Sequence, residues 1–226
     1  MRFTRNSRVD RFSRSQISGA GGGGGAGGIT LIKTGQSGSL VNTFSLGMTA
    51  EAGDVVVVNL YGWTGSFTAV PSGNARSYTG HAVSSQQMGL VILAAGDTAI
   101  EWPESGPPDF GQPARYAWAL WRGCDPVTPV SSRASGGNGT AGLNLTAARD
   151  GSLNVQSGTF GGGSSLVFTG GGFAAADDGV TAIDGAGGWT GSINFLAVDI
   201  ADGANGSAGS YANTAVRGAM MLQPPA

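Results

Sequence analysis

The sequence has few of the residues on which most enzyme and metal sites depend. Its 226 residues include one cysteine, Cys124, and one histidine, His81. A single cysteine permits neither an intrachain disulfide nor a cysteine-based zinc site. Any Ser-His-acid triad would need His81, yet no Gly-x-Ser-x-Gly nucleophile motif occurs in the chain. We therefore interpret His81 as a strand-end or surface residue and predict that the protein is not an enzyme.

Long apolar segments are also missing. The longest, "DVVVVNLYGW" and "MGLVILAAG", are far shorter than the ~20 residues that a membrane-spanning helix needs. The N-terminus lacks the apolar stretch of a secretory signal. The glycine run near it lacks the Gly-Lys-Ser/Thr of a phosphate-binding loop. We expect neither membrane insertion nor a nucleotide site.

Charged residues are scarce, at 12% of the chain, and unevenly spread. The first 14 residues hold five arginines and one acidic residue, whereas the rest of the chain is acidic enough to bring the net charge to −2. A basic tail on an acidic body indicates two parts that meet different surfaces.

The basic tail has a regular spacing, with an arginine at every third position before the run "GAGGGGGAGG". A helix would scatter this spacing around its axis, whereas an extended chain with three residues per turn would align it along one edge. We predict an anchoring arm over residues 1–18, held in an acidic groove of neighbouring subunits, and a glycine-rich linker over 19–28. Nucleic acid is the less favoured partner because the body adds no second basic patch. The predicted arm contacts are Arg2, Phe3, Arg5, Arg8, Arg11, Phe12 and Arg14.

From residue 29 onward the pattern changes to short apolar or alternating runs separated by glycine, Asp-Gly or proline. Most runs have four to eight residues and are rich in Val, Thr, Phe and Trp. Sustained helical periodicity is not seen in any long stretch. We predict an all-β domain over 29–226, a β-sandwich of jelly-roll-like type. Residues 161–209 repeat a strand-then-glycine theme without a fixed period, which favours turns and loops over a solenoid.

Two groups of acidic residues are candidates for a chemical site. Glu101 and Glu104 flank Trp102, as carboxylates and an aromatic do in some sugar-cleaving sites, but the neighbouring prolines predict a loop. Aspartates lie among glycines in the C-terminal half, where a Ca²⁺ site would be built, yet they lack the spacing of a known calcium loop. We expect no cofactor, with Ca²⁺ as the alternative. These aspartates are Asp177, Asp178, Asp184, Asp199 and Asp202.

Several motifs carry a resemblance to a known family. They are the glycine run, "AGDVVVVNLYGW", "AAGDTAIEW", "YAWALWRGCDPVTPV" and the glycine-rich C-terminal half. From about residue 21 the chain resembles a β-sandwich protein of tailed-phage virions and gene transfer agents. In that family Ala-Gly-Asp begins a core strand and Arg-Gly-x-Asp-Pro follows the aromatic strand. The resemblance implies structural duties for Asp54, Pro126 and Pro129, and it brings no catalytic residue.

These observations lead to one functional prediction with two alternatives. We expect a fibre or spike of a virion, assembled in the host cytoplasm and anchored by the arm to tail, portal-vertex or capsid proteins. We expect a homo-oligomer, with a trimer favoured, whose Trp63, Trp102 and Trp189 contact a host-surface glycan. The first alternative is a capsid decoration protein, and the second is a carbohydrate-active hydrolase on the same fold.

Overall fold

All regular elements that the structure describes are β-strands. This computed structural model describes residues 28–37, 43–61, 77–83, 86–101, 115–161, 168–169, 180–182, 189–195, 200–204 and 209–226. Every strand pair within these ranges is antiparallel. Among these residues there is no helix long and apolar enough to cross a membrane. The predicted all-β class is confirmed for this part of the chain, while the arm and residues 19–27 of the linker lie outside it.

The N-terminal half of the chain builds a five-stranded sheet, here called the first sheet. Its strand order is β1-β7-β3-β5-β4. A separate two-stranded sheet pairs β2 with β6. The strands are β1 (Thr30–Ser37), β2 (Thr43–Ser45), β3 (Val55–Tyr61), β4 (Ser77–Val83), β5 (Gln86–Ile92), β6 (Ala99–Glu101) and β7 (Arg115–Arg122).

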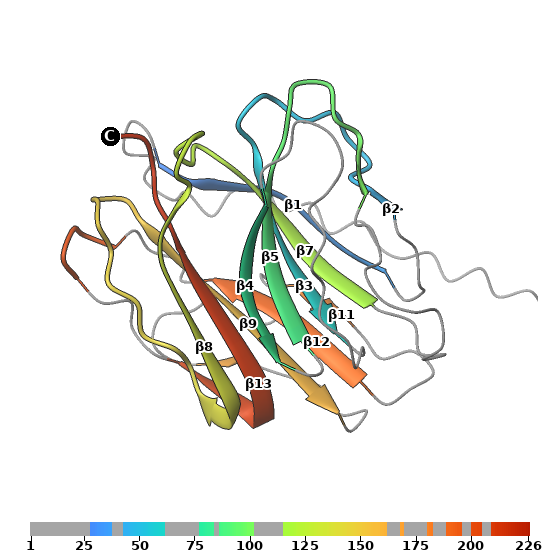
Figure 1. The fold of residues 1–226 in the computed structure, drawn as a ribbon, viewed down its shortest axis with the longest axis vertical. Coiled ribbons are helices and arrows are strands. Elements are labelled where there is room, and N and C mark those ends of the chain that lie inside the picture. The colour runs from blue at the N-terminus through green and yellow to red at the C-terminus, as the bar shows by residue number, and fades with distance from the viewer. Residues whose placement is uncertain are drawn as a thin grey trace, which may run out of the picture.

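The C-terminal half builds the second sheet, whose strands run in a similar direction to those of the first sheet (Figure 1). Its order is β10-β13-β9-β12-β11, and β8 pairs with the other edge of β13. The strands are β8 (Val130–Ala141), β9 (Leu153–Gly161), β10 (Phe168–Thr169), β11 (Val180–Ala182), β12 (Trp189–Phe195) and β13 (Ser210–Leu222).

The valine run at the start of β3 is buried on both faces because successive side chains of a strand point to opposite sides. Val55 and Val57 belong to a hydrophobic cluster shared by both sheets, which includes Val155 of β9. Val56 and Val58 belong to a second cluster, which lies on the opposite face of the first sheet, away from the second sheet. A strand buried on both faces explains why this segment reads as a continuous apolar run rather than an alternating one.

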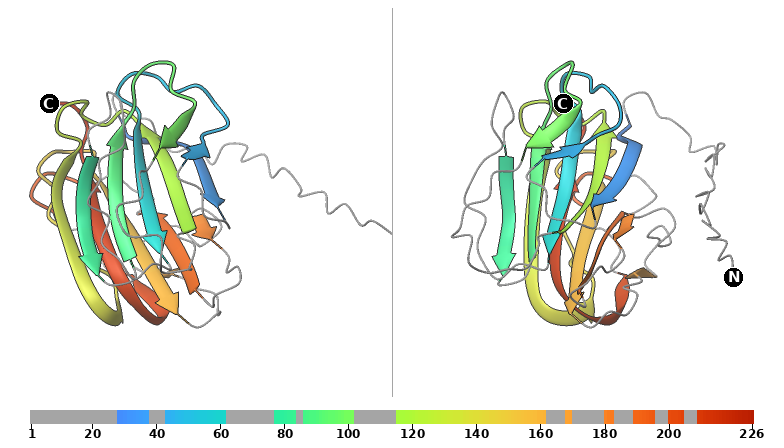
Figure 2. Two further views of the ribbon diagram at one scale, coloured as in Figure 1. Left: turned by 45° about the vertical axis from the view of Figure 1, so that its right-hand side comes forward. Right: turned by 90° about the vertical axis from the view of Figure 1, so that its right-hand side faces the viewer.

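The sheets have two distinct ends, which the chain uses differently. At the end we call proximal, β7 finishes at Arg122 opposite Thr30 of β1. At the distal end, β7 begins at Arg115 opposite Tyr61 of β3. The eight residues of β7 separate the two ends by about 23 Å at the usual rise of a strand. The C-terminus also lies at the proximal end (Figures 1 and 2).

Candidate functional site

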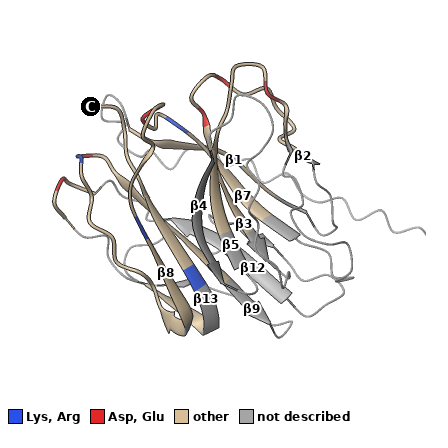
Figure 3. Cartoon of the chain, in the orientation of Figure 1, with Lys and Arg blue, Asp and Glu red and all other residues tan. Residues whose placement is uncertain are grey.

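The proximal end carries most of the described charged residues, as the coloured segments of Figure 3 show. Its first carboxylate is Asp54, whose side chain is 1% exposed. Nε and Nη2 of Arg122 donate to its two oxygens at 2.8 and 2.9 Å, and the N–H of Glu51 donates to Oδ2 at 2.9 Å. Burial alone would raise the pKa of Asp54, but these hydrogen bonds together hold it below its ordinary value. The group is therefore a fixed anion.

The second carboxylate, Asp125, ties the loop after β7 to distant parts of the chain. Its Oδ1 accepts the N–H groups of Val127 and Thr128 at 2.8 and 2.9 Å, and its Oδ2 accepts Nη1 of Arg149 at 2.6 Å. The same nitrogen of Arg149 donates to the Pro224 carbonyl at 2.7 Å. The hydrogen bonds from Thr128, Arg149 and Val127 lower the pKa of Asp125. This loop and the C-terminus are thus fastened together.

The start of the described chain is seated against the same loop. Gly123 has φ +86°, and a Cβ there would lie 2.8 Å from the Gly28 carbonyl oxygen. Any side chain at this position would therefore be strained and would collide with residue 28. The segment that follows the glycine run joins the body here, at the proximal end.

The chemistry of this end is that of a structural junction. Cys124 is 4% exposed, and burial, with the nearby charges of Asp54 and Asp125, raises the pKa of its thiol to about 12. Such a thiol is not a nucleophile at neutral pH. Within the described ranges no group of three or more His, Cys, Asp or Glu residues could hold a metal ion.

The structure brings the two recognised motifs together, which their separation in sequence did not reveal. The Asp54 of Ala-Gly-Asp pairs with the Arg122 of Arg-Gly-x-Asp-Pro. Gly53, at φ +87°, lies so close to Pro126 that a Cβ would be 3.3 Å from the proline Cβ. Arg149 was not expected to take part, and the sequence contains no local signal for its pairing with Asp125.

The structure describes some of the other predicted site residues and not the rest. Trp189 begins β12 opposite Gly161, His81 lies within β4, and Glu101 ends β6. Asp202 is exposed in a turn, where its N–H donates to Oδ1 of Asp150 at 2.9 Å. Outside the described residues lie all the arm contacts, Trp63, Trp102, Glu104, Asp177, Asp178, Asp184 and Asp199.

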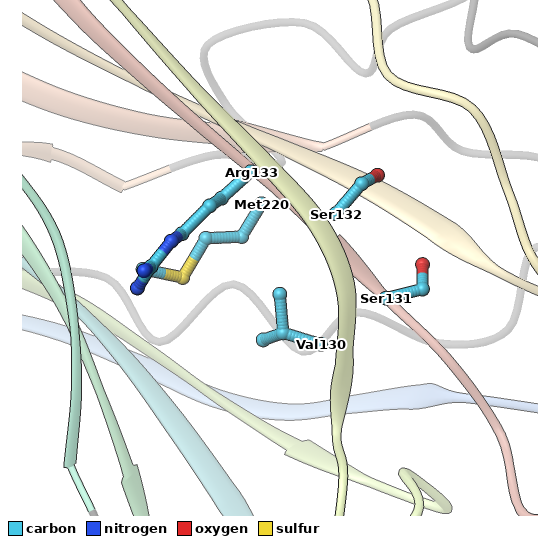
Figure 4. A pocket seen from close by; sticks show the side chains of 5 residues that line it. All are labelled: Val130, Ser131, Ser132, Arg133 and Met220. Atoms are coloured by element: carbon cyan, nitrogen blue, oxygen red, sulfur yellow. The ribbon is translucent and has the colours of Figure 1, made fainter.

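One cavity of about 220 Å³ lies beside β8. Val130, Arg133 and Met220 point to one side of the β8 ribbon, and Ser131 and Ser132 to the other (Figure 4). Ser132 donates to the Thr146 carbonyl at 3.0 Å, so its hydroxyl is engaged in the fold. The cavity is smaller than the ~300 Å³ at which ligand pockets begin, and we do not assign it a ligand.

Comparison with known proteins gave no match to a family model, to a curated protein or to a solved structure.

Proposed function

We propose that the protein is a non-enzymatic structural component of a virion, anchored by residues 1–18 and projecting a β-sandwich body. The observation that supports this most directly is the separation of the two ends. Residue 28 meets Gly123 at the proximal end. Strands β3 and β9 both finish at the distal end, at Tyr61 and Gly161. An anchor at one end leaves the connections at the other end facing outward.

The proposed sandwich rests on the shared hydrophobic cluster. Val57 and Leu90 of the first sheet and Val155 and Met220 of the second belong to it. Two sheets joined by a common buried cluster are the defining feature of a β-sandwich. The jelly-roll type is not confirmed: each described sheet is built from one half of the chain, so consecutive strands do not alternate between the two sheets.

The distal end is also where we propose contact with a host-surface glycan. Trp63 follows the end of β3 by two residues, a distance of at most about 7 Å along the chain. Trp189 begins β12 opposite Gly161. Of the three proposed contacts, only the backbone of Trp189 is described, and it lies at the end opposite the proposed anchor. Trp63 and Trp102 lie outside the described residues and are proposed from their sequence positions after β3 and β6.

Particle incorporation tests the anchor. We expect Arg5, Arg8 and Arg11, replaced together by Ala, to abolish incorporation while the circular dichroism spectrum and Tm of the purified chain stay unchanged. The matched control replaces the same three residues by Lys, which keeps the charge and so retains most incorporation. An alanine variant that enters particles at the normal copy number would contradict the proposal.

The position of the anchored arm separates the alternatives. An arm on a tail or portal-vertex protein supports a fibre or spike, and an arm threaded between major capsid subunits indicates a decoration protein. A homo-oligomer, with a trimer favoured, is the proposed assembly. Polysaccharide cleavage that is lost in Glu101→Gln or Glu104→Gln would show the chain to be a hydrolase instead.

A further inference from the structure

The two sheets have the same strand order when each is followed along its own half of the chain. The first sheet runs β1-β7-β3-β5-β4, and the second runs β8-β13-β9-β12-β11, with the two-residue strand β10 added beside the start of β13 as the one strand without an equivalent in the described part of the first sheet. Counting the five strands of each order along the chain, the first and second strands flank the last one in both halves, and the fourth strand pairs with the second. Ala219 of β13 has partners on both sides, Ala134 of β8 and Gln156 of β9, which fixes β8 at the edge.

An irregularity of the pairing recurs at the same place. In the first sheet the register shifts between Leu31, opposite Trp121, and Lys33, opposite Leu120. In the second sheet it shifts between Val130, opposite Leu222, and Ser132, opposite Met221. In each case one residue of the edge strand is skipped at the proximal end. A β-bulge is a specific local feature, so its recurrence at equivalent positions is strong evidence of a common origin.

The sequence before the central strand of each sheet is also repeated. "LGMTAEAGDVVVV" begins at Leu46 and "LNLTAARDGSLNV" begins at Leu143. Both contain Leu, then Met or Leu, then Thr-Ala at the same spacing. Both continue to a glycine with positive φ, Gly53 at +87° and Gly151 at +76°, directly before the residue that precedes β3 or β9.

A pair of backbone hydrogen bonds attaches this segment to an equivalent turn in each half. The alanine of the Thr-Ala pair donates to the last residue of the turn and accepts from its glycine. These glycines, Gly96 and Gly203, both have positive φ, +96° and +71°. The bonds are Ala50 N to Asp97 O at 2.8 Å, Gly96 N to Ala50 O at 3.0 Å, Ala147 N to Ala204 O at 2.9 Å and Gly203 N to Ala147 O at 3.0 Å.

The packing between the sheets follows the same correspondence. β1 contacts β11, and their equivalents in the other half, β8 and β4, also contact each other. In the same way β7 contacts β12, and their equivalents β13 and β5 are in contact. β3 contacts its own equivalent, β9. There, Nδ2 of Asn59 donates to the Gly158 carbonyl at 3.0 Å, next to Ser157, the equivalent of Asn59. An arrangement in which each element meets the equivalent of its partner is that of a twofold axis.

We infer that the chain is a tandem duplication of one unit, residues 28–126 and 127–226, and that the facing sheets form an isologous interface. The inner face of each unit is the binding surface for a second copy of that unit. In this protein both copies are supplied by one chain, and the loop fastened by Asp125 is the junction between them. The inference rests on pairing and packing and is independent of the proposed virion function.

A change of unit order tests the boundary between the units. The first variant places residues 127–226 before 1–126, so that residues 1–27 become the connection. We expect its Tm to lie within about 5 °C of the parent. The control opens the chain between Ala95 and Gly96, an exposed proximal turn inside the first unit, and we expect a larger fall. A boundary variant that loses as much Tm as this control, or more, would overturn the inference.

A distance measurement on the unpermuted chain tests the twofold axis itself. Spin labels are placed on two pairs of exposed equivalents, Thr34 with Thr146 and Arg133 with Thr49, with Cys124 replaced by Ala. Because Thr34 corresponds to Arg133 and Thr49 to Thr146, exchange of the units converts one pair into the other. We expect coincident distance distributions from the two pairs. Two separate distances would overturn the twofold relation even if both permuted chains fold.

Discussion

The two units share a framework but hold their outer covers by different means. In the first unit the covering segment pairs through β2 and β6, and Val56 and Val58 of β3 pack beneath it. The equivalent positions of β9 are Asn154 and Gln156, both fully buried. Strand pairing and the shared inner cluster are therefore what the units have in common. The outer cover can be either apolar or polar on the same framework.

In the second unit the side chain of Gln156 makes hydrogen bonds to the covering segment, whereas in the first unit a neighbouring backbone segment makes them. Its Oε1 accepts the Leu143 N–H at 2.9 Å, and its Nε2 donates to the Leu143 carbonyl at 2.6 Å. In the first unit the equivalent residue, Leu46, donates its N–H to the Thr98 carbonyl at 2.8 Å. A side-chain amide has one donor group and one acceptor, so it can imitate a peptide group of a neighbouring strand.

The proximal ends differ in charge. Asp54 and Arg122 form an ion pair in the first unit, and their equivalents in the second are Ser152 and Gln223. Ser152 donates to the Arg149 carbonyl at 2.7 Å. The equivalent turns are therefore stabilised by an ion pair in the first unit and by a neutral hydrogen bond in the second. Substitutions that place the residues of the second unit in the first can test whether the two are interchangeable.

The largest effect is expected from Arg122→Ala, which leaves the buried carboxylate of Asp54 without its partner. We expect a loss of about 3 kcal/mol in the free energy of unfolding, measured in urea; Arg122 is 36% exposed, which keeps the loss at the low end for a broken buried pair. The double variant Asp54→Ser/Arg122→Gln copies the second unit and should lose less. A double variant as unstable as Arg122→Ala would show that the two turns are not interchangeable.

A smaller effect is expected at the outer cover of the second unit. Gln156→Val copies Val58 of the first unit but leaves the Leu143 N–H and carbonyl without their partner, at a cost of about 2 kcal/mol. The matched control is Asn154→Val. Oδ1 of Asn154 accepts from Nε2 of Gln156 at 2.8 Å, but its Nδ2 is buried without a hydrogen-bond partner in the described part of the chain. Its replacement removes one hydrogen bond together with one unsatisfied donor, so we expect a clearly smaller loss than for Gln156→Val. Equal losses in both variants, read from urea melts, would contradict the role given to Gln156.

Acid should weaken the proximal junction. The pKa values of Asp54 and Asp125 are lowered in the folded chain, so their contribution to stability is complete above the ordinary value of 3.8 and is lost as pH falls below it. We expect the Tm to fall between pH 5 and pH 2. Asp125→Asn should lower Tm at pH 7 and flatten this fall. A parallel curve for the variant would show that Asp125 does not contribute to the acid response.

The smallest effects are expected at the equivalent turn glycines. A Cβ at Gly96 or Gly203 would meet no atom within 4 Å, so Gly→Ala is penalised only by the positive φ. We expect about 1 kcal/mol at each site, measured by thermal melts. The informative result is the equality of the two losses, because clearly unequal values would indicate that the turns differ in conformation.

Part of this arrangement could be predicted from the sequence. Short runs of Val, Thr and aromatic residues between glycines predict strands, and the valine run indicates burial on both faces. The duplication is hard to recognise in the sequence because the strand-then-glycine theme of the glycine-rich half has no fixed period. The repeated Leu-x-Met/Leu-Thr-Ala segments lie roughly 100 residues apart, well beyond the 20–50 residues typical of repeat arrays. The number of residues between each of these segments and its later turn glycine, Gly96 or Gly203, also differs between the two halves.

The candidate site was less accessible to sequence analysis. Asp54 and Asp125 stand in motifs that mark turns, so a structural duty could be expected for them. Their partners could not be identified, since the pairing of β7 with β3 brings Arg122 to Asp54 across 68 residues, and Arg149 reaches Asp125 from a loop 24 residues further along the chain. Gln156 reads as an ordinary outward-facing polar residue of a strand, and only the covering segment above it makes it a buried one.

The seating of Gly28 against Gly123 has a mechanical consequence. A body held at residue 28 and pulled from its distal end transmits the force through β1 into β7 along the strand direction. The hydrogen bonds of an antiparallel pair are perpendicular to that direction, so they resist sliding together rather than opening one after another. Tension applied instead between residues 28 and 224, both at the proximal end, would act across the junction of the two units. The fold therefore resists tension most strongly along the strand direction, and residue 28 lies at one end of that direction.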